Sequence, residues 1–448
     1  MKRTTISLCI LAALFVFPHA ARAQFLFVDC SGTNPFAYPN INAALPSAGP
    51  GAFIQVTGTC NENVFIFGAQ TLTMSGAATL NGNLTFFGSQ NVFVHDLTVN
   101  GNLSVTNSQN VYVLRLNVTN PFGDGIDVNS SHSVGLDTIN SSNNAANGLT
   151  VFASEVLINN FGTLSNNRGQ GVFVGNNSLL NIGSFGGTTE ISNNQSSAVG
   201  VDRSVFEAIG SIHMAGNGAV AIDSRGAGRT LMFSILGLSP NIIENNPKGA
   251  VSLQETSEFS IGAAVPGTPG VISNNGPFGI EAGFGSQVTL FGVTISGHTG
   301  PGVDVYAHSQ LYGAGQLPGV AATQIQNNAT AGGSLNAAIR VDGNSEALLR
   351  SVTISQNNGP AILALVNSSA DLAGNTFSGN TSMITCDSTS TMVSDLSILA
   401  RTPAAGVSCT TAHSLGNRVV STPAPAVPDI SLWKKMHSDY QQRSVAKE

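Results

Sequence analysis

Short segments in which apolar and polar residues alternate recur along most of the chain. Asn81–Val99 reads NGNLTFFGSQNVFVHDLTV and Asn100–Val118 reads NGNLSVTNSQNVYVLRLNV, so the two align without a gap at a period of 19 residues. Within such segments Val and Ile occupy one set of alternate positions and Thr, Ser and Asn the other, as in a strand with one buried face. The chain is therefore predicted to consist of repeated short β-strands.

Farther along, the repeat lengthens but keeps one phrase: two asparagines, a few small residues, Gly or Ala, and then an alternating segment. A serine opens a second alternating segment six or seven residues later, and a third short segment leads to the next pair of asparagines. The second asparagines are Asn144, Asn167, Asn194, Asn246, Asn275, Asn328 and Asn358, with a degenerate copy at Gly216-Asn217-Gly218. The serines are Ser131, Ser154, Ser178, Ser204, Ser257, Ser286, Ser309, Ser345 and Ser368. Each copy is thus predicted to contain three strands separated by bends.

One such copy cannot bury its own apolar face, so neighbouring copies must stack. Stacking of like positions in parallel predicts a parallel β-helix of 11–12 coils. Asn tolerates the left-handed backbone of tight bends, and stacked Asn side chains bond to one another, so the many asparagines need no functional explanation. The composition excludes two other classes, because 9% charged residues are too few for a coiled coil and 42% hydrophobic residues too many for a disordered chain.

Tyr38–Ile66 reads YPNINAALPSAGPGAFIQVTGTCNENVFI. This segment resembles the opening of pectin-lyase-like right-handed parallel β-helix proteins, in which a short amphipathic helix caps the first coil. By that resemblance Ile41, Ala44 and Leu45 form the apolar face of the cap. The resemblance covers about residues 28–385 and implies an all-β, single-stranded right-handed parallel β-helix. It implies no single function, because this fold hosts lyases, hydrolases, esterases and adhesins.

The catalytic motifs of those enzymes are missing from the sequence. The segment GDGID at 123–127 resembles the start of the first polygalacturonase motif, but the Asp-Asp and Gly-His-Gly motifs do not occur. The signatures of pectate lyases and pectin methylesterases are absent as well. Whether the chain is an enzyme is therefore left open by its motifs.

The N-terminal end of the chain is typical of an export signal. Lys2 and Arg3 precede an apolar run over residues 6–17, and a small-x-small cleavage site follows at 21–23. Residues 1–23 are expected to be a signal peptide, and the mature protein to be secreted, periplasmic or at the cell surface. No later apolar run is long enough for a transmembrane helix.

The C-terminal end also departs from the repeat. The β-helix domain is expected over residues 24–420, a Pro-rich linker over 421–428 and an amphipathic helical tail over 429–448. A short isolated helix is marginal in water, so the apolar face of the tail is expected to pack against the β-helix. A disordered tail and a docking peptide for another protein are the alternatives. That face consists of Ile430, Trp433, Met436 and Tyr440.

Charge and cysteine content limit the kinds of binding partner and the cellular compartment that fit this chain. The formal net charge is −7, and Lys248 is the only lysine between Lys2 and Lys434, so there is no basic stripe for nucleic acid or anionic lipid. The histidines show no zinc-site spacing, and no cofactor is expected. Four cysteines follow the signal peptide, and an exported chain can oxidise them. Local pairing is expected, with free buried thiols as the alternative; the pairs are Cys30–Cys60 and Cys386–Cys409.

Stacking predicts one candidate catalytic cluster. The outward positions of the first strands are Asp127, Thr150, Phe173, Gly200, Ala221, Ser252, Glu281, Asp304, Arg340 and Leu363. Glu281, Asp304 and Arg340 fall on successive coils, and the outward column two residues on contains Tyr306 and Asp342. Carboxylates on adjacent coils lie at about the separation used by retaining glycosidases, near 5 Å.

The same cluster allows other readings. It could hold Ca²⁺, with Arg340 as the base of a lyase by resemblance. The plainest alternative is that Arg340 merely neutralises two exposed acids on a polar face. We therefore expect an exported, non-catalytic β-helix scaffold, surface-associated or glycan-binding. The alternative function is that of a polysaccharide lyase or glycoside hydrolase, with Glu281, Asp304, Arg340 and Asp342 as its catalytic residues.

Overall fold

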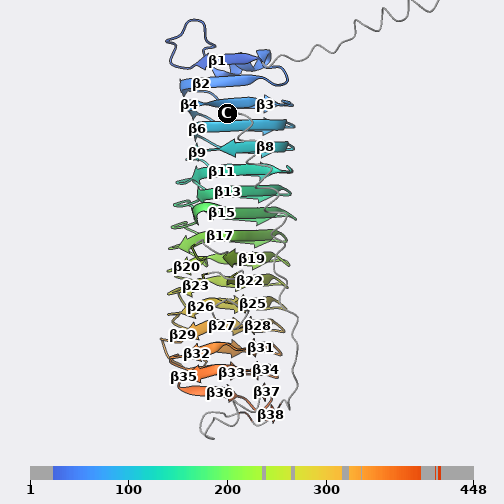
Figure 1. Cartoon of the computed structure of the whole chain (residues 1–448), viewed down its shortest axis with the longest axis vertical. Helices are drawn as coiled ribbons and strands as arrows, with labels where there is room; N and C mark the ends of the chain where they lie inside the picture. Colours follow the sequence, from blue (N-terminus) through green and yellow to red (C-terminus); the bar gives the residue numbers. More distant parts are fainter. Residues whose placement is uncertain are drawn as a thin grey trace, which may run out of the picture.

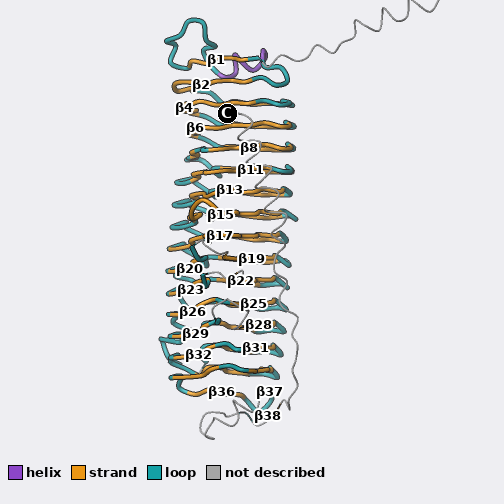
Figure 2. Tube along the Cα trace, in the orientation of Figure 1, coloured by secondary structure: helices purple, strands orange, loops and turns teal. Residues whose placement is uncertain are grey.

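The computed structural model describes residues 24–234, 239–263, 268–314, 322–333, 335–394, 409 and 412–414. Together they form a rod of coils stacked along one axis (Figure 1). Within these residues nearly all of the regular structure is strand, with helix only near the N-terminal end (Figure 2). The expected signal peptide, linker and tail, with the expected packing face at Ile430, Trp433, Met436 and Tyr440, lie outside the described residues.

One side of the rod is a sheet of 14 strands, which we call the first sheet. Each of its strands belongs to a different coil, so the rest of a coil separates one strand of this sheet from the next along the chain. They are β3 (Val64–Phe67), β5 (Leu84–Phe87), β7 (Leu103–Thr106), β10 (Ile126–Asn129), β12 (Leu149–Phe152), β14 (Val172–Gly175), β16 (Val199–Asp202), β18 (Ile222–Arg225), β21 (Val251–Leu253), β24 (Ile280–Ala282), β27 (Val303–Val305), β30 (Ile339–Val341), β33 (Pro360–Ala364) and β36 (Ser382–Cys386).

The other two sides of the rod are joined into one sheet of 24 strands. On the second side lie β1 (Phe25–Asp29), β2 (Phe53–Cys60), β4 (Thr73–Asn81), β6 (Gln90–Asn100), β8 (Gln109–Leu114), β11 (Val134–Ser141), β13 (Glu155–Thr163), β15 (Leu179–Glu190), β17 (Val205–Ala215), β19 (Arg229–Ser234), β22 (Glu258–Ala263), β25 (Gln287–Phe291), β28 (Gln310–Ala314), β31 (Glu346–Arg350), β34 (Ser369–Ala373), β37 (Thr391–Ser394) and β38 (Ala412–Ser414). On the third side lie β9 (Asn117–Val118), β20 (Ile242–Glu244), β23 (Gly270–Ser273), β26 (Val293–Ser296), β29 (Gln324–Gln326), β32 (Thr353–Ser355) and β35 (Thr376–Ser378).

The two sides merge because several strands continue around the bend between them. β6, for example, pairs with β8 through His95 and with β9 through Thr98. From the coil of β19 to that of β35 each coil instead has three separate strands, as the sequence predicts. All of the strand pairs are parallel between successive coils, so the predicted parallel β-helix is confirmed.

The rod has more coils than the predicted 11–12, since the first sheet alone contributes 14 strands. The coils near the two ends depart most from the repeat. There the asparagine phrase is missing, as in the coil of β3 (Val64–Phe67) and in that of β36 (Ser382–Cys386). Counting asparagine pairs therefore underestimates the length of the rod.

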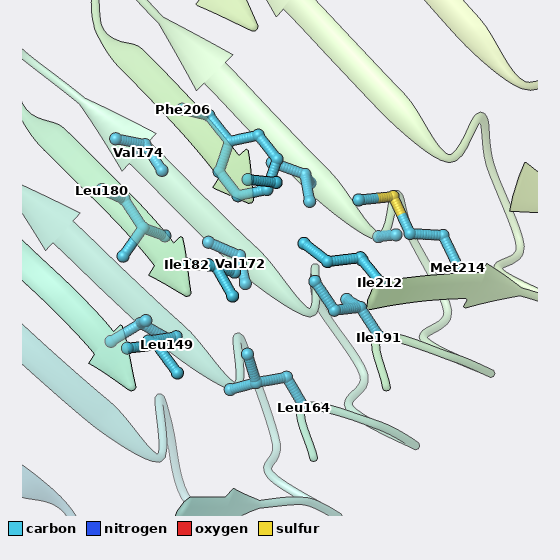
Figure 3. Close-up of a cluster of buried hydrophobic side chains, with 14 of the residues drawn as sticks. Leu149, Leu164, Val172, Val174, Leu180, Ile182, Ile191, Phe206, Ile212 and Met214 are labelled. Atoms are coloured by element: carbon cyan, nitrogen blue, oxygen red, sulfur yellow. The ribbon is translucent and has the colours of Figure 1, made fainter. Parts of the chain in front are cut away.

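The core is a stack of aliphatic side chains that point inward from each strand. Figure 3 shows this stack midway along the rod, where Leu149, Val172, Leu180 and Ile182 contribute from two sides. Every inward residue of the first sheet in one column is buried, at 0–1% exposure. That column is Val64, Leu84, Leu103, Ile126, Leu149, Val172, Val199, Ile222, Val251, Ile280, Val303, Ile339, Ile362 and Ile384. Burying one such side chain stabilises the fold by about 1.5–3 kcal/mol, and this gain drives the stacking of coils.

A buried column of asparagines runs beside this core. Its side chains bond to one another from coil to coil over 2.8–3.0 Å. We call this column the asparagine ladder; its unbroken part is Asn144, Asn167, Asn194, Asn217, Asn246 and Asn275. Glycine precedes the next strand because a Cβ at Gly148 would lie only 2.7 Å from Nδ2 of Asn167.

The sequence identifies the ladder correctly except in its last phrase. The first asparagine of each pair takes a left-handed backbone conformation, with φ of 52° to 61° from Asn143 to Asn327. In the last copy Gln356 takes that conformation, with φ of 56°. The ladder residue there is therefore Asn357, which accepts from Asn328, and the prediction of Asn358 is wrong. The predicted serine column is hydrogen-bonded as well, for example from the Ser131 N–H to Oγ of Ser154.

The N-terminal end of the rod is closed by a cap. The helix α2 (Ile41–Ala44) continues into the 3₁₀ turn η1 (Leu45–Ser47), and Ile41 and Ala44 are buried against the first coils. Disulfides join Cys30 to Cys60 and Cys386 to Cys409, which are the local pairs that the sequence predicts. Among the described residues, no helix has the length and apolar character needed to cross a membrane.

Candidate functional site

The outer face of the first sheet carries the residues that the sequence selects. Glu281 on β24 pairs with Asp304 on β27, which pairs with Arg340 on β30, so the three lie on adjacent rungs as predicted. The predicted outward column is wrong at one place. Ile222 points inward and pairs with Val199, so the next residue, Asp223, faces outward, whereas Ala221 is buried.

Arg340 holds Asp304 in a two-point ion pair. Its Nε donates to Oδ1 of Asp304 over 2.9 Å, and its Nη2 lies 2.7 Å from Oδ2. Asp304 is only 6% exposed, so this pair is not the exposed charge neutralisation considered from sequence. A carboxylate held in this fork is fixed in orientation as well as in charge.

Tyr306 and Phe284 place aromatic rings beside the acids. The Tyr306 hydroxyl hydrogen-bonds to Glu281. Its ring lies over Gly283, where a Cβ would come within 2.5 Å of the ring carbons, and it meets the exposed ring of Phe284 edge-on at 5.8 Å between centroids. Glycine at position 283 is thus what lets the ring lie flat on the sheet.

Burial changes the proton affinities of the cluster. It raises the pKa of Asp304 to about 6, although the Arg340 guanidinium opposes the rise. Burial also raises the pKa of Glu281, against the hydrogen bond from Tyr306 and the charge of Arg340. Asp342 is half-buried and adds to the rise at Asp304 through its negative charge. The cluster therefore has two neighbouring carboxyl groups with raised pKa values, a pattern that marks candidate functional sites.

A buried histidine lies on the same coil as Asp304 and was not singled out from sequence. His298 occupies the position of the asparagine ladder between Asn275 and Asn328. Its Nδ1 lies 3.1 Å from the carbonyl oxygen of Asn275, and its buried Nε2 has no partner. Burial lowers its pKa, so the neutral form is favoured. The signal was present in the sequence, since the phrase SGHTGPG has His where the other copies have Asn.

The GDGID segment has a structural use in this fold. Asp124 accepts from the Asn147 N–H at 2.8 Å and from the Thr150 hydroxyl at 2.7 Å. Asp127 lies on the outer face beside it, and burial together with the charge of Asp124 raises its pKa. Asp124 therefore ties neighbouring coils together, while Asp127 adds a further acid to the outer face.

Among the described residues, one group of three potential metal ligands lies close enough to share an ion: Cys30, Cys60 and Glu62. Both sulfurs are bonded to each other, and Glu62 accepts from the N–H groups of Ile41 and Asn42 at the start of α2. This group is therefore used for structure and does not offer a metal site.

No known family profile matches the chain, and no characterised protein matches it by sequence. Comparison of structures finds the receptor-binding tailspike protein of bacteriophage Det7, with 10% identity and a TM-score of 0.41 over 94% of this chain and 80% of the other. The surface adhesin PfbA of Streptococcus pneumoniae matches with 12% identity and a TM-score of 0.34, over 79% and 87%. The A-module of a mannuronan C-5 epimerase of Azotobacter vinelandii matches with 13% identity and a TM-score of 0.31, over 84% and 94%. It is the strand pairing of the chain itself that establishes it as a parallel β-helix protein.

Proposed function

We propose that this chain is an exported β-helix scaffold that binds an extended glycan along the outer face of the first sheet. The observation that carries the proposal is the cluster of Glu281, Asp304, Arg340, Asp342 and Tyr306 on adjacent rungs. Charged hydrogen-bonding groups lie there beside the exposed edge of an aromatic pair, and a sugar ring needs both kinds of partner. Rungs spaced about 4.8 Å apart repeat at close to the length of one sugar unit of an extended chain.

Two further observations support this proposal. Disulfides near both ends of the β-helix fit an oxidising compartment, in line with the expected signal peptide. The fork between Arg340 and Asp304 favours binding over catalysis, because both groups are already committed to each other. A proton transfer at Asp304 would have to break that ion pair.

Affinity electrophoresis in gels that contain soluble polysaccharides tests the proposal. Arg340→Gln should weaken binding by about tenfold or more, because it releases the fork and leaves Asp304 unpaired. Arg225→Gln is the matched control, since Arg225 makes the same fork with Asp223 on the same sheet but in a more exposed place. Equal loss of binding in both variants, or none in either, would refute a role for the cluster.

A polysaccharide lyase or glycoside hydrolase is the second candidate function. It is favoured by the pKa of about 6 at Asp304 beside a second, half-buried acid, which suits a general acid. Release of reducing ends or of unsaturated products from acidic and neutral polysaccharides would support it, provided that Asp304→Asn abolishes the activity. Binding without any cleavage by the wild-type protein would instead favour the scaffold.

A further inference from the structure

We propose a second glycan-binding site at the N-terminal end of the rod, specific for neutral sugars and independent of the acid cluster. Its centre is an aromatic platform on the first sheet, made of Phe65 and Phe67 on β3 and Phe87 on β5. β3 lies near the N-terminal end of the rod, and β27 lies in its other half (Figure 1). Ten rungs separate them, which corresponds to about 48 Å.

The platform is open to solvent. Phe65 is 56% exposed and Phe67 is 72% exposed, although neighbouring inward positions are fully buried. The rings of Phe67 and Phe87 are nearly parallel, at 9° and 5.6 Å between centroids, and Phe65 lies 6.4 Å from each of them. Exposed phenylalanine rings grouped in this way form an apolar surface patch, and such a patch is typical of an interaction site.

A groove of about 520 Å³ borders the platform. It lies between the N-terminal cap and the first coils, and its walls include Pro46, Pro50 and Ile66 together with the platform residues Phe65 and Phe67. Its volume is in the range of small-ligand sites, which are mostly apolar with a few polar groups. Here polar groups come from Asn42 and the exposed Gln70.

The chemistry of the surroundings identifies the ligand as uncharged. None of the described residues that line the groove is charged, and the outward residues of the next strands are hydroxyl-bearing, such as Thr85 and Ser104. The nearby acid Glu62 accepts two backbone N–H groups of α2 and is thereby satisfied. A pyranose ring offers an apolar C–H face for the phenylalanines and a rim of hydroxyls for these polar groups. A polyuronate would bring carboxylates to a place without any cation.

Binding of the full-length chain to mixed-linkage β-glucan, arabinoxylan, galactomannan and polygalacturonate tests this proposal. The double variant Phe65→Ala/Phe67→Ala should weaken binding of at least one neutral polysaccharide by about tenfold or more. Phe122→Ala is the control, because Phe122 is 94% exposed but lies outside the platform and the groove. Size-exclusion chromatography with light scattering should give the same mass for the wild type and both variants.

The outcomes separate this site from the acid cluster. Loss of neutral-glycan binding in the double variant, with Arg340→Gln unaffected, supports the platform and shows that it acts independently of the cluster. Loss only in Arg340→Gln supports the cluster and overturns the platform. Binding of polygalacturonate that depends on the platform, or a wild-type oligomer that the double variant dissociates, also overturns it. A wild type that binds no polysaccharide refutes both.

Discussion

The coils from Asn144 to Asn275 and the coil of His298 follow the same plan but differ in how the residue at the ladder position is hydrogen-bonded. In the first region the side chain of each ladder asparagine hydrogen-bonds to that of the next, without a gap from Asn144 to Asn275. In the second, His298 interrupts the ladder and leaves a buried nitrogen without a partner. The same coil carries Asp304, a buried acid with a raised pKa. Regular repetition thus gives stability, and departures from it occur together with the chemically unusual residues.

The largest effect is expected in the regular region. Asn194→Ala should lower the free energy of unfolding by about 3–5 kcal/mol, because it leaves several buried groups unsatisfied at once. Among them are the side chain of Asn167 and the Leu164 carbonyl, which bond to Asn194 over 2.9 Å and 3.0 Å. Denaturant unfolding followed by circular dichroism measures the change.

The control for this variant is Asn81→Ala. Asn81 also belongs to a stacked asparagine column, with Asn61 and Asn100 as partners at 2.7 Å and 2.8 Å, but this column is exposed. Water replaces the lost bonds there, so the expected loss is below about 1 kcal/mol. Equal losses in both variants would show that burial is not what makes the ladder important.

The second effect concerns Asp304 in the interrupted region. A carboxyl group whose pKa is raised in the folded state stabilises the fold below that value and loses the contribution as pH rises. The rise from 3.8 to about 6 corresponds to about 3 kcal/mol, lost between about pH 4 and pH 7. Asp304→Asn should therefore be more stable than the wild type by about 2–3 kcal/mol at pH 7.5 and equal to it near pH 4.

Thermal unfolding as a function of pH measures this difference. Asp223→Asn is the control, since Asp223 forms a similar but more exposed pair with Arg225 and should change stability by less than about 1 kcal/mol. A destabilised Asp304→Asn at neutral pH would mean that the ion pair with Arg340 outweighs the cost of burying the charge.

The contrast between the two regions also explains what the sequence predicts well. Alternation and the asparagine phrase identify a parallel β-helix because each coil repeats the same bend and the same inward residues. The predictions are wrong where the repeat is degenerate: Asp223 replaces Ala221 on the outer face, and Asn357 replaces Asn358 in the ladder. In both places one residue of register decides which side chain points inward.

For the candidate site, the sequence predicts only which residues lie on adjacent rungs. Stacking places Glu281, Asp304 and Arg340 side by side, and the sequence shows this because like positions pair. The burial of Asp304 and the bond from Tyr306 to Glu281 depend on how side chains cover one another across coils. The aromatic platform was missed for the same reason, since Phe65 and Phe67 follow the ordinary alternation of a strand.

The smallest effect is expected from repair of the ladder. His298→Asn gives Asn275 and Asn328 a partner that can bond to both and removes the unpaired Nε2. The gain should be only about 1 kcal/mol at pH 7.5. In the wild type the histidine ring fills the space beside Gly279, since a Cβ on that residue would lie 2.8 Å from Nε2 of His298. The smaller Asn side chain leaves part of this space empty, which limits the gain.

The pH dependence of this variant carries the sharper test. Burial lowers the pKa of His298, so the unfolded chain takes up a proton near pH 6.5 while the folded chain does not. Stability of the wild type therefore falls as pH drops below about 6.5, and the advantage of His298→Asn should widen there. His308→Asn, at an exposed histidine on the same coil, should show no such widening. A constant difference between wild type and His298→Asn from pH 7.5 to 5 would mean that His298 is protonated within the fold, and that the interruption of the ladder is a charged site rather than a neutral gap.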